Sequence, residues 1–323
     1  MKKRFFGGIL FLLTVWQLNA ATFFVKPGAT GSGESWTNAS GDLRFILTNA
    51  LAGDEVWVAK GVYFPTTDYN RTHSFPLNNG VAVYGGFEGS ETSLGERIIK
   101  KHYSVLSGEI GTSQKTDNTI NVVTTTDATD TTILDGFIIT GGYAGGGGPA
   151  GNSTASGGGL YLKGLITGLH IRNCHFVENT ARDGGAIYYW SANSQSNYWK
   201  ITECRFQNNK AFLGGGAVFN SASTDEKSDL QLKKCTFLNN SAGFGGAIFQ
   251  LGLKGKATAF ITESEFRGNT AMIQGGCIYH FGNQGLSVSK LINCKFTENR
   301  APRGNTVAYS IENTPLKLRE TKL

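Results

Sequence analysis

Charged side chains recur at nearly constant intervals in the second half of the chain and could carry out acid–base chemistry. Glu203, Lys234 and Glu263 are 31 and 29 residues apart, and Arg205 follows Glu203 by two positions. A lysine or arginine base beside further cations could remove the proton next to a uronate carboxylate and stabilise the charge that develops. The alternative is a solvated row of alternating charges that stabilises the fold. These four residues are the candidate catalytic residues.

Aromatic side chains flank one polar loop and could bind sugars. Tyr189 and Trp190 precede the loop 191–197, and Tyr198 and Trp199 follow it. Exposed rings can stack on the apolar face of a sugar ring, so we predict that these four residues bind a ligand. The alternative is that they pack the loop onto the body of the protein.

Motifs for metals, nucleophiles and phosphates are missing from the sequence. The cysteines have no CxxC or Cys/His spacing, and the few histidines give no Ser-His-Asp pattern. The glycine runs 145–148 and 157–159 are not followed by GK[ST]. We expect no metal and no cofactor. Ca²⁺ would be required only if the chain were a lyase, and no pair of aspartates supplies a carboxylate cage for it.

Internal repeats are the strongest signal in the chain. Each has an aliphatic residue, then Cys-x-Phe-x-x-Asn-x-Ala, then Gly-Gly and a β-branched residue, and consecutive repeats are 29 to 31 residues apart. Alternation with a period of two and β-branched columns predict strands. One such unit cannot bury its own apolar face, so the units must stack. The repeats span residues 171–189, 201–219, 232–249, 261–279 and 291–309.

Stacking brings equivalent residues about 4.8 Å apart. We expect a ladder of asparagines at sharp left-handed bends, with amides bonded along the stack. Four cysteines and Ser264 share one column, and we expect buried free thiols there. Glu203 and Glu263 would be about 10 Å apart, slightly more than a pair of glycosidase carboxylates. The asparagine ladder is Asn179, Asn209, Asn240, Asn269 and Asn299.

Composition and charge exclude several classes of protein. The chain has 323 residues with 44 glycines and 6 prolines, and 40% of its residues are hydrophobic. A core can form, but so much glycine argues against a helical bundle. The net charge is +6, of which Lys2, Lys3 and Arg4 contribute three. No basic run remains beyond them, so we expect no nucleic-acid partner.

Residues 1–20 have the charged start and short apolar stretch of a signal peptide. We predict an N-terminal cap at 21–64, irregular coils with insertions at 65–133, and regular repeats of about 30 residues at 134–310. A tail follows at 311–323, too short to cap a solenoid well, so a partner chain could cover that end. No later segment has the apolar length of a transmembrane helix.

A short amphipathic helix is predicted in the cap, because Leu43, Ile46, Leu47, Ala50 and Leu51 form one apolar stripe. Asp42 or Ser40 would cap its N-terminus. The repeat frame also fits a leucine-rich repeat. That solenoid usually has shorter units and a helix on the convex side, so we favour strands throughout.

Residues 23–66 resemble the start of many bacterial parallel β-helix proteins of the pectin-lyase-like superfamily. The segments GVAVYGGFEGSETSLGER, LSGEIGT and LDGFIITGGYA resemble the continuation of the same group, common in Bacteroidetes. The F-x-x-N and G-G-A-[IV] elements also resemble polymorphic outer membrane proteins. The resemblance covers about residues 22–310 and implies an all-β, right-handed parallel β-helix in an exported bacterial protein. It says little about function, because such proteins include polysaccharide lyases, glycosidases and adhesins.

We therefore expect a secreted, periplasmic or outer-membrane surface protein of a Gram-negative bacterium with a binding or adhesive role. Its partner would be a polysaccharide or another glycan of the host or cell envelope. The alternative is a polysaccharide lyase or related carbohydrate-active enzyme acting on acidic glycans, and whether the chain is an enzyme stays open. A third hypothesis is that it is part of a larger surface assembly.

Overall fold

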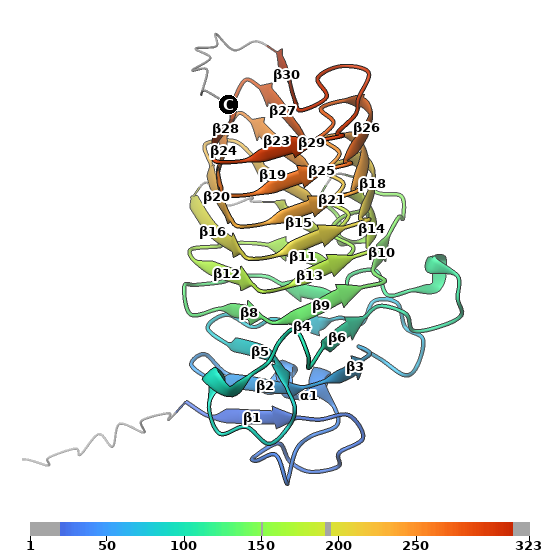
Figure 1. The fold of residues 1–323 in the computed structure, drawn as a ribbon, viewed down its shortest axis with the longest axis vertical. Coiled ribbons are helices and arrows are strands. Elements are labelled where there is room, and N and C mark those ends of the chain that lie inside the picture. The colour runs from blue at the N-terminus through green and yellow to red at the C-terminus, as the bar shows by residue number, and fades with distance from the viewer. Residues whose placement is uncertain (1–19, 150, 191–194, 313–323) are drawn as a thin grey trace, which may run out of the picture.

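The computed structural model describes residues 20–149, 151–190 and 195–312. The predicted signal peptide and most of the predicted tail lie outside these ranges. The described chain winds into a stack of coils, with β1 at one end and β28, β29 and β30 at the other (Figure 1). All strand pairs within its sheets are parallel, and they form four sheets that run along the stack. The predicted all-β parallel solenoid is confirmed.

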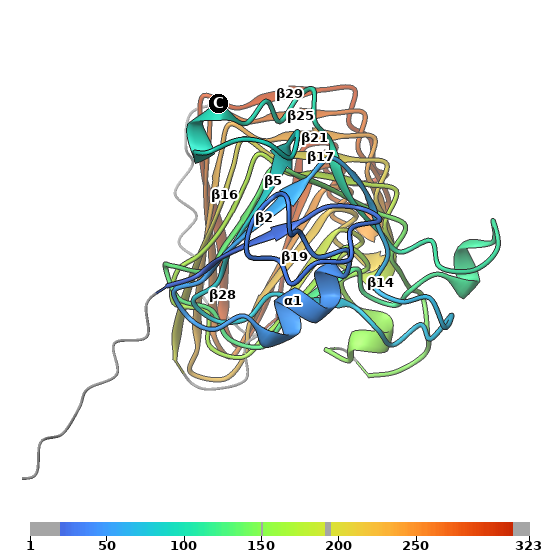
Figure 2. The same cartoon turned by 90° about the horizontal axis from the view of Figure 1, so that it is seen from below.

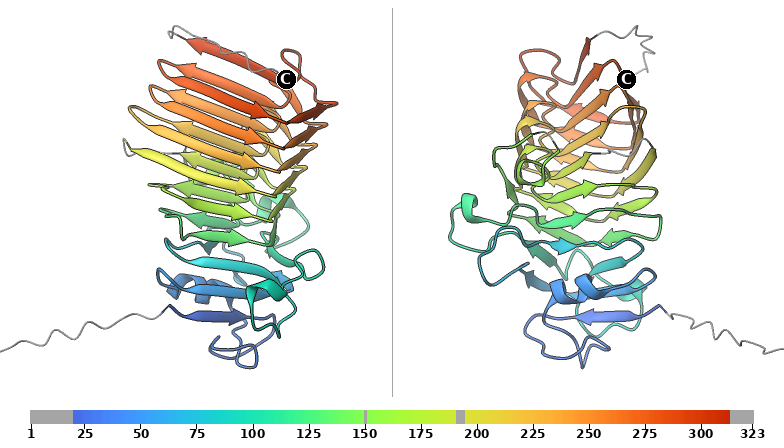
Figure 3. Two further views of the ribbon diagram at one scale, coloured as in Figure 1. Left: turned by 60° about the vertical axis from the view of Figure 1, so that its left-hand side comes forward. Right: turned by 180° about the vertical axis from the view of Figure 1, so that it is seen from behind.

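The longest sheet has nine strands and forms one side of the stack (Figure 3, left). Its strands within residues 169–262 alternate buried and outward residues, as half-buried strands must. Ala82–Phe87, in contrast, is buried throughout. In order along the stack they are β1 (Thr22–Val25), β2 (Glu55–Ala59), β5 (Ala82–Phe87), β8 (Ile133–Asp135), β12 (Leu169–Arg172), β16 (Ser196–Thr202), β20 (Lys227–Lys233), β24 (Lys256–Thr262) and β28 (Leu286–Ile292).

Two eight-stranded sheets form two further sides. The first comprises β3 (Gly61–Tyr63), β6 (Ser104–Ser107), β9 (Phe137–Thr140), β13 (His175–Val177), β17 (Arg205–Gln207), β21 (Thr236–Leu238), β25 (Glu265–Arg267) and β29 (Lys295–Thr297). The second comprises β4 (Phe75–Pro76), β7 (Val123–Thr125), β11 (Leu160–Lys163), β15 (Ile187–Trp190), β19 (Val218–Ala222), β23 (Ile248–Leu253), β27 (Ile278–Asn283) and β30 (Val307–Glu312).

A five-stranded sheet lies between those two sheets in the path of each regular coil. It comprises β10 (Tyr143–Ala144), β14 (Thr180–Asp183), β18 (Lys210–Gly214), β22 (Ser241–Phe244) and β26 (Thr270–Gln274). The described chain also contains the helix α1 (Leu43–Asn49) and the 3-10 helices η1 (Leu94–Glu96), η2 (Lys115–Asp117) and η3 (Ser153–Ala155). None of them has the length and apolarity needed to cross a bilayer.

Stacked rings fill the centre of the solenoid. The predicted phenylalanine column lies inside, and its ring centroids are 5.2, 4.8, 4.6 and 5.0 Å apart from one coil to the next. Each ring is parallel to its neighbours within 11°. Equal coil lengths produce this ladder, because each residue then meets its own equivalent in the next coil. The column is Phe176, Phe206, Phe237, Phe266 and Phe296.

The asparagine ladder is buried, but its members are not the left-handed residues. The side chain of Asn209 accepts hydrogen bonds from the backbone N–H and the Nδ2 of Asn179, both at 3.1 Å. The residue before each asparagine turns the chain instead, as at Asn208 (φ 55°). The predicted bend position is therefore wrong by one residue, because the asparagine must point inward to bond along the stack.

The cysteine column is also in place, and all five cysteines are free thiols. The thiol of Cys204 lies 3.4 Å from the backbone nitrogen of Cys174, so the column runs along the stack beside the phenylalanines. Burial raises the pKa of Cys235 to about 12. Burial also raises the pKa of Cys204 and Cys277, so these three thiols are unreactive small core side chains.

The helix α1 forms where it was predicted. Asp42 caps it by accepting a hydrogen bond from the N–H of Phe45 at 2.9 Å. Leu43, Ile46 and Leu47 are buried. Leu51, predicted to belong to the same stripe, is 58% exposed because the helix ends at Asn49. The helix lies beside β4 and β2 at the N-terminal end of the stack (Figure 2). Because this solenoid has strands on every side of its regular coils, the leucine-rich repeat alternative is excluded for them.

Candidate functional site

Three of the four candidate catalytic residues lie in a bend rather than on a strand. Glu203, Lys234 and Glu263 have φ of 54°, 54° and 52°. They form the left-handed corner between the nine-stranded sheet and the β3–β29 sheet, as Asn173 does in the preceding coil. Only a small part of conformational space is open to a non-glycine residue at positive φ. The corner therefore repeats a backbone geometry needed by the scaffold.

The side chains at this corner form exposed ion pairs across neighbouring coils. Lys234 Nζ lies 3.9 Å from Glu203 Oε1, and Lys233 Nζ lies 3.6 Å from Glu263 Oε1. All four side chains are between 44% and 57% exposed. Such pairs contribute about 0–1 kcal/mol to stability. Arg205, on β17, donates from Nε to Gln207 Oε1 at 2.8 Å. The repeat thus places these charges in a solvated row, which was the alternative to a catalytic site.

The four candidate binding aromatics separate into two groups. Tyr189 and Trp199 are fully buried in the core, with ring centroids 5.8 Å apart. Their prediction as exposed ligand-binding rings is therefore wrong. Strand alternation is the reason: Ile201 faces inward, so Trp199 two residues earlier does too. Trp190 is half-buried and lies against Gly151. Tyr198 points outward from the nine-stranded sheet.

Tyr198 belongs to a shallow groove of about 280 Å³ on the outer face of β16, β20, β24 and β28. The parallel register places Tyr198, Asp229, Thr258 and Val288 side by side in one row. The adjacent row holds Lys200, Gln231, Phe260 and Lys290. We call the outward residues of these four strands the lysine–aromatic face.

Lysines surround the two rings of this face. Lys200 Nζ lies 5.2 Å from the centroid of the Tyr198 ring, and Lys290 Nζ lies 5.5 Å from that of Phe260. Phe260 is 39% exposed although it is a large apolar residue. An ammonium group above an aromatic ring is attracted to the face of that ring, and it can still contact solvent. Each pair therefore offers an apolar plate next to a positive charge.

The lysine–aromatic face has a net positive charge, although Lys233 is ion-paired with Glu263 at the corner beside it. Its outward positions carry five lysines and one aspartate. The aspartate, Asp229, is ion-paired with Lys227 and accepts a hydrogen bond from Thr258. Positive charge therefore exceeds negative on this face, which favours anionic ligands. The lysines are Lys200, Lys227, Lys233, Lys256 and Lys290.

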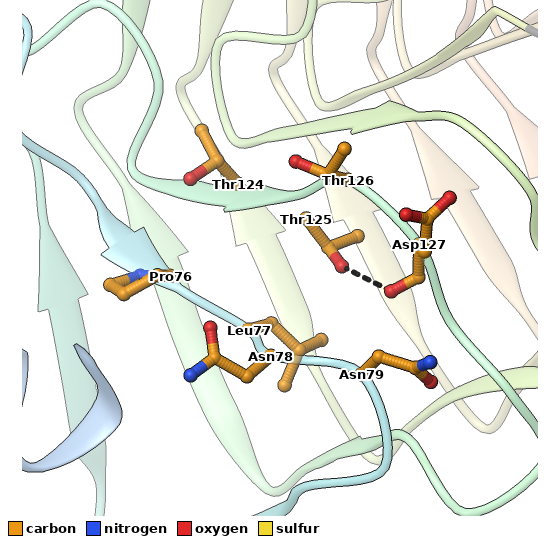
Figure 4. A pocket seen from close by; sticks show the side chains of 8 residues that line it. All are labelled: Pro76, Leu77, Asn78, Asn79, Thr124, Thr125, Thr126 and Asp127. Atoms are coloured by element: carbon orange, nitrogen blue, oxygen red, sulfur yellow. Dashed lines mark hydrogen bonds between the residues drawn. The ribbon is translucent and has the colours of Figure 1, made fainter. Parts of the chain in front are cut away.

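A second groove, of about 260 Å³, lies between the segments 76–79 and 124–127 (Figure 4). Its polar side chains already serve the scaffold. Asn78 Nδ2 donates to the carbonyls of Leu47 and Ala50 at 2.9 and 3.0 Å, and Thr125 donates to the Asp127 carbonyl at 3.1 Å. This groove therefore joins coils together and presents few free polar groups.

A third groove, of about 530 Å³, lies between the start of α1 and the loop after β3. Phe64 is 48% exposed there. Asp68 lies 3.6 Å from His73 Nδ1. The pKa of the Asp68 carboxyl is lowered mainly by its hydrogen bond with the Thr66 hydroxyl. The backbone N–H of Asn70 also lowers it. The Asp68 carboxylate therefore accepts hydrogen bonds from residues of its own loop.

No cluster of three or more His, Cys, Asp or Glu side chains that could hold a metal ion occurs within the described ranges. The residues that sequence reasoning missed are Phe260, Lys200 and Lys290. Strict alternation within Lys256–Thr262 could have found Phe260, because it lies between the inward residues Ala259 and Ile261. Their proximity follows from the register between strands.

A family model described as the Chlamydia polymorphic membrane protein repeat matches residues 234–250. The matched segment holds the corner residue Lys234, the ladder residue Asn240 and the glycine pair at 245–246. It includes none of the outward residues of β20 and β24. None of the curated proteins compared with the chain matches it. Fold and match together define a β-helix repeat protein, and they describe its scaffold rather than its ligand.

Proposed function

We propose that this protein is an exported bacterial surface protein that binds acidic glycans through the lysine–aromatic face. The repeat match supports an outer-membrane or surface location. The observation that carries the glycan proposal is that Tyr198, Phe260 and Lys290 line one groove. Lys200 lies against the Tyr198 ring beside it, and Lys290 lies against the Phe260 ring. Uronates present both an apolar sugar face and a carboxylate, which these pairs complement.

The geometry favours a linear polymer over a small ligand. The groove runs across four neighbouring strands of the nine-stranded sheet, which lie about 4.8 Å apart. Beyond β16 the row of Lys200 continues through His170 on β12. A groove this shallow cannot enclose a small molecule. A chain of acidic sugars, by contrast, would contact several coils at once and gain affinity from each.

The test is affinity electrophoresis in gels containing polygalacturonate, with a neutral glucan gel for comparison. We expect the wild type to be retarded by the uronate polymer, and less so at high salt because screening weakens exposed charges. Tyr198→Ala/Phe260→Ala and Lys200→Gln/Lys290→Gln should each weaken binding at least tenfold. The matched control, Lys295→Gln, removes an exposed lysine from β29 and should leave binding unchanged. Unchanged binding by both double variants would overturn the proposal.

The same polymer tests the lyase alternative. Incubation with and without Ca²⁺ is followed by absorbance of unsaturated products. Product formation that disappears in Arg205→Ala or Lys234→Ala would replace a binding role by an enzymatic one. We expect no product, because both groups lie outside the groove.

A further inference from the structure

Four large apolar side chains protrude from the five-stranded sheet. Phe212 and Leu213 on β18 are 43% and 45% exposed, and Met272 and Ile273 on β26 are 71% and 46% exposed. Single exposed apolar residues are common on protein surfaces, but clusters mark sites of interaction. The two pairs lie on strands of the same sheet that are separated by β22.

The register explains why they protrude. Lys210 pairs with Ser241 and Thr270 along the stack, and Gly214 pairs with Phe244 and Gln274. Between these pairs β22 has one residue fewer than β18 and β26, so the register shifts. The extra residue makes β18 and β26 bulge, two coils or about 10 Å apart. We call the residues 211–213 and 271–273 the apolar bulges.

Gly243 forms the floor between the bulges. A Cβ atom added there would lie 2.9 Å from the Leu213 carbonyl oxygen, so the coil packs closely against the bulge below it. The intervening coil thus leaves the two apolar pairs as separate ridges. They cannot cover each other, which is why Met272 stays so exposed.

Basic residues form the rim of the bulges. Lys210 Nζ lies 5.3 Å from the centroid of the Phe212 ring. The next coil after β26 brings Arg300 and Arg303 alongside Thr270 and Gln274, and both are exposed. Acidic groups nearby are Glu298, two residues before Arg300, and Asp183, which is buried and bound by Arg182 at 2.7 Å. Positive charge therefore exceeds negative charge around the ridges.

We propose that the apolar bulges dock this protein on a bilayer surface that contains anionic lipid. Protruding Phe, Leu, Met and Ile side chains can enter the boundary between headgroups and acyl chains, while Lys210, Arg300 and Arg303 remain at the level of the headgroups. A glycan bound at the apolar bulges would leave their aliphatic side chains exposed to water. A protein partner is the less favoured occupant, since convex ridges offer no pocket for an anchoring side chain.

Docking would leave the lysine–aromatic face free. In the path of each coil the β3–β29 sheet separates β18 and β26 from the nine-stranded sheet on one side, and the β4–β30 sheet separates them on the other. A membrane and a polysaccharide could therefore be bound at the same time by different sides of the stack. The lipid proposal does not depend on the glycan proposal.

The experiment is co-sedimentation of the protein with vesicles of phosphatidylethanolamine and phosphatidylglycerol, compared with pure phosphatidylcholine. We expect wild-type binding to the anionic vesicles, at least tenfold weaker binding to phosphatidylcholine, and loss of affinity in high salt. Phe212→Ser/Leu213→Ser/Met272→Ser/Ile273→Ser should reduce binding to anionic vesicles at least tenfold. Lys210→Gln/Arg303→Gln should remove the preference for anionic lipid.

The matched control is Ile98→Ser, which removes an apolar side chain that is 51% exposed in an early coil. It should bind vesicles as the wild type does. Melting temperatures show whether each variant is folded, and Met272→Ser alone replaces the quadruple variant if that variant unfolds. Absence of wild-type binding, or equal binding by the folded serine variants, would overturn the proposal. A variant that keeps vesicle binding but loses self-association would overturn it as well and identify a protein interface.

Discussion

Asn209 donates a hydrogen bond from Nδ2 to Oδ1 of Asn240 at 3.0 Å, although the two residues are 31 positions apart. The same Oδ1 accepts a bond from the backbone N–H of Asn209, also at 3.0 Å. Asn240 in turn donates to the Phe206 carbonyl at 3.0 Å and to Asn269 Oδ1 at 2.9 Å. Asn209 and Asn240 thus join their coils to both neighbours, and both side chains are fully buried.

Asn240→Ala should destabilise the fold by about 3 kcal/mol, because it leaves several buried donors and acceptors without partners. Urea unfolding followed by circular dichroism measures this free energy. The matched control, Gln207→Ala, removes a partly exposed amide from the next sheet and should cost less than about 1 kcal/mol. Similar losses in both variants would show that the ladder is not an important source of stability.

The left-handed corner predicts that two substitutions at Lys234 differ in their effect on stability. Lys234→Val should lower the free energy of unfolding by about 1–2 kcal/mol, because a β-branched residue tolerates φ of 54° poorly. Lys234→Gly should stay within about 1 kcal/mol of the wild type, since relief of strain offsets the added freedom of the unfolded chain. Equal stabilities of the two variants would contradict a backbone role for this corner.

Asp135 holds three partners in a buried cluster. Its carboxylate accepts from Arg97 Nη2 at 3.0 Å, Arg172 Nε at 2.9 Å and Asn173 Nδ2 at 2.8 Å. Asp135→Asn should lower the free energy of unfolding by about 3–5 kcal/mol, because Arg97 would be left buried without its counter-charge. Asp229→Asn, in a more exposed ion pair, serves as the control and should cost less than about 1 kcal/mol.

His280 should make stability fall in mild acid. Burial lowers the pKa of His280 to about 3, and its Nδ1 lies 2.9 Å from Ser287 Oγ. Its ordinary pKa is about 6.5, so below that pH the unfolded chain binds a proton that the folded chain does not. Above pH 6.5 the neutral ring makes its full contribution to the free energy of unfolding. Between pH 6.5 and pH 3 this contribution falls by about 1.4 kcal/mol for each pH unit.

The measurement compares His280→Gln, which copies Gln250 from the preceding coil, with the wild type at pH 7 and pH 5. The wild type should lose about 2 kcal/mol more than the variant between these two values. Other titrating groups are common to both proteins and cancel in the difference. Parallel pH dependence of the two proteins would contradict a neutral, buried His280.

Most of the scaffold could be predicted from the sequence because its repeats have nearly equal lengths. Constant spacing of Phe176, Phe206 and Phe237 requires that they stack, and the same holds for the asparagines and cysteines. The position of the bend was predicted one residue too late. Several conformations satisfy an Asn-containing turn, and only the bonds from Asn209 to Asn240 select the inward side chain.

The candidate site was predicted less well, because a surface depends on which side of a strand each residue faces. Residues 191–197 are mostly polar, so Tyr189 and Trp199 read as aromatics at the edges of a loop although both face the core.

Sequence alone determined that this chain is a stack of parallel β-coils. A one-dimensional repeat needs only equal spacing and a period of two to specify which residues meet. The tertiary structure decided which outward residues share a surface. Tyr198 and Lys290 are 92 positions apart, and they line one groove only because four strands align in register. The apolar bulges likewise arise because β22 has one residue fewer than β18 and β26. This difference in length has an effect only when the three coils are stacked.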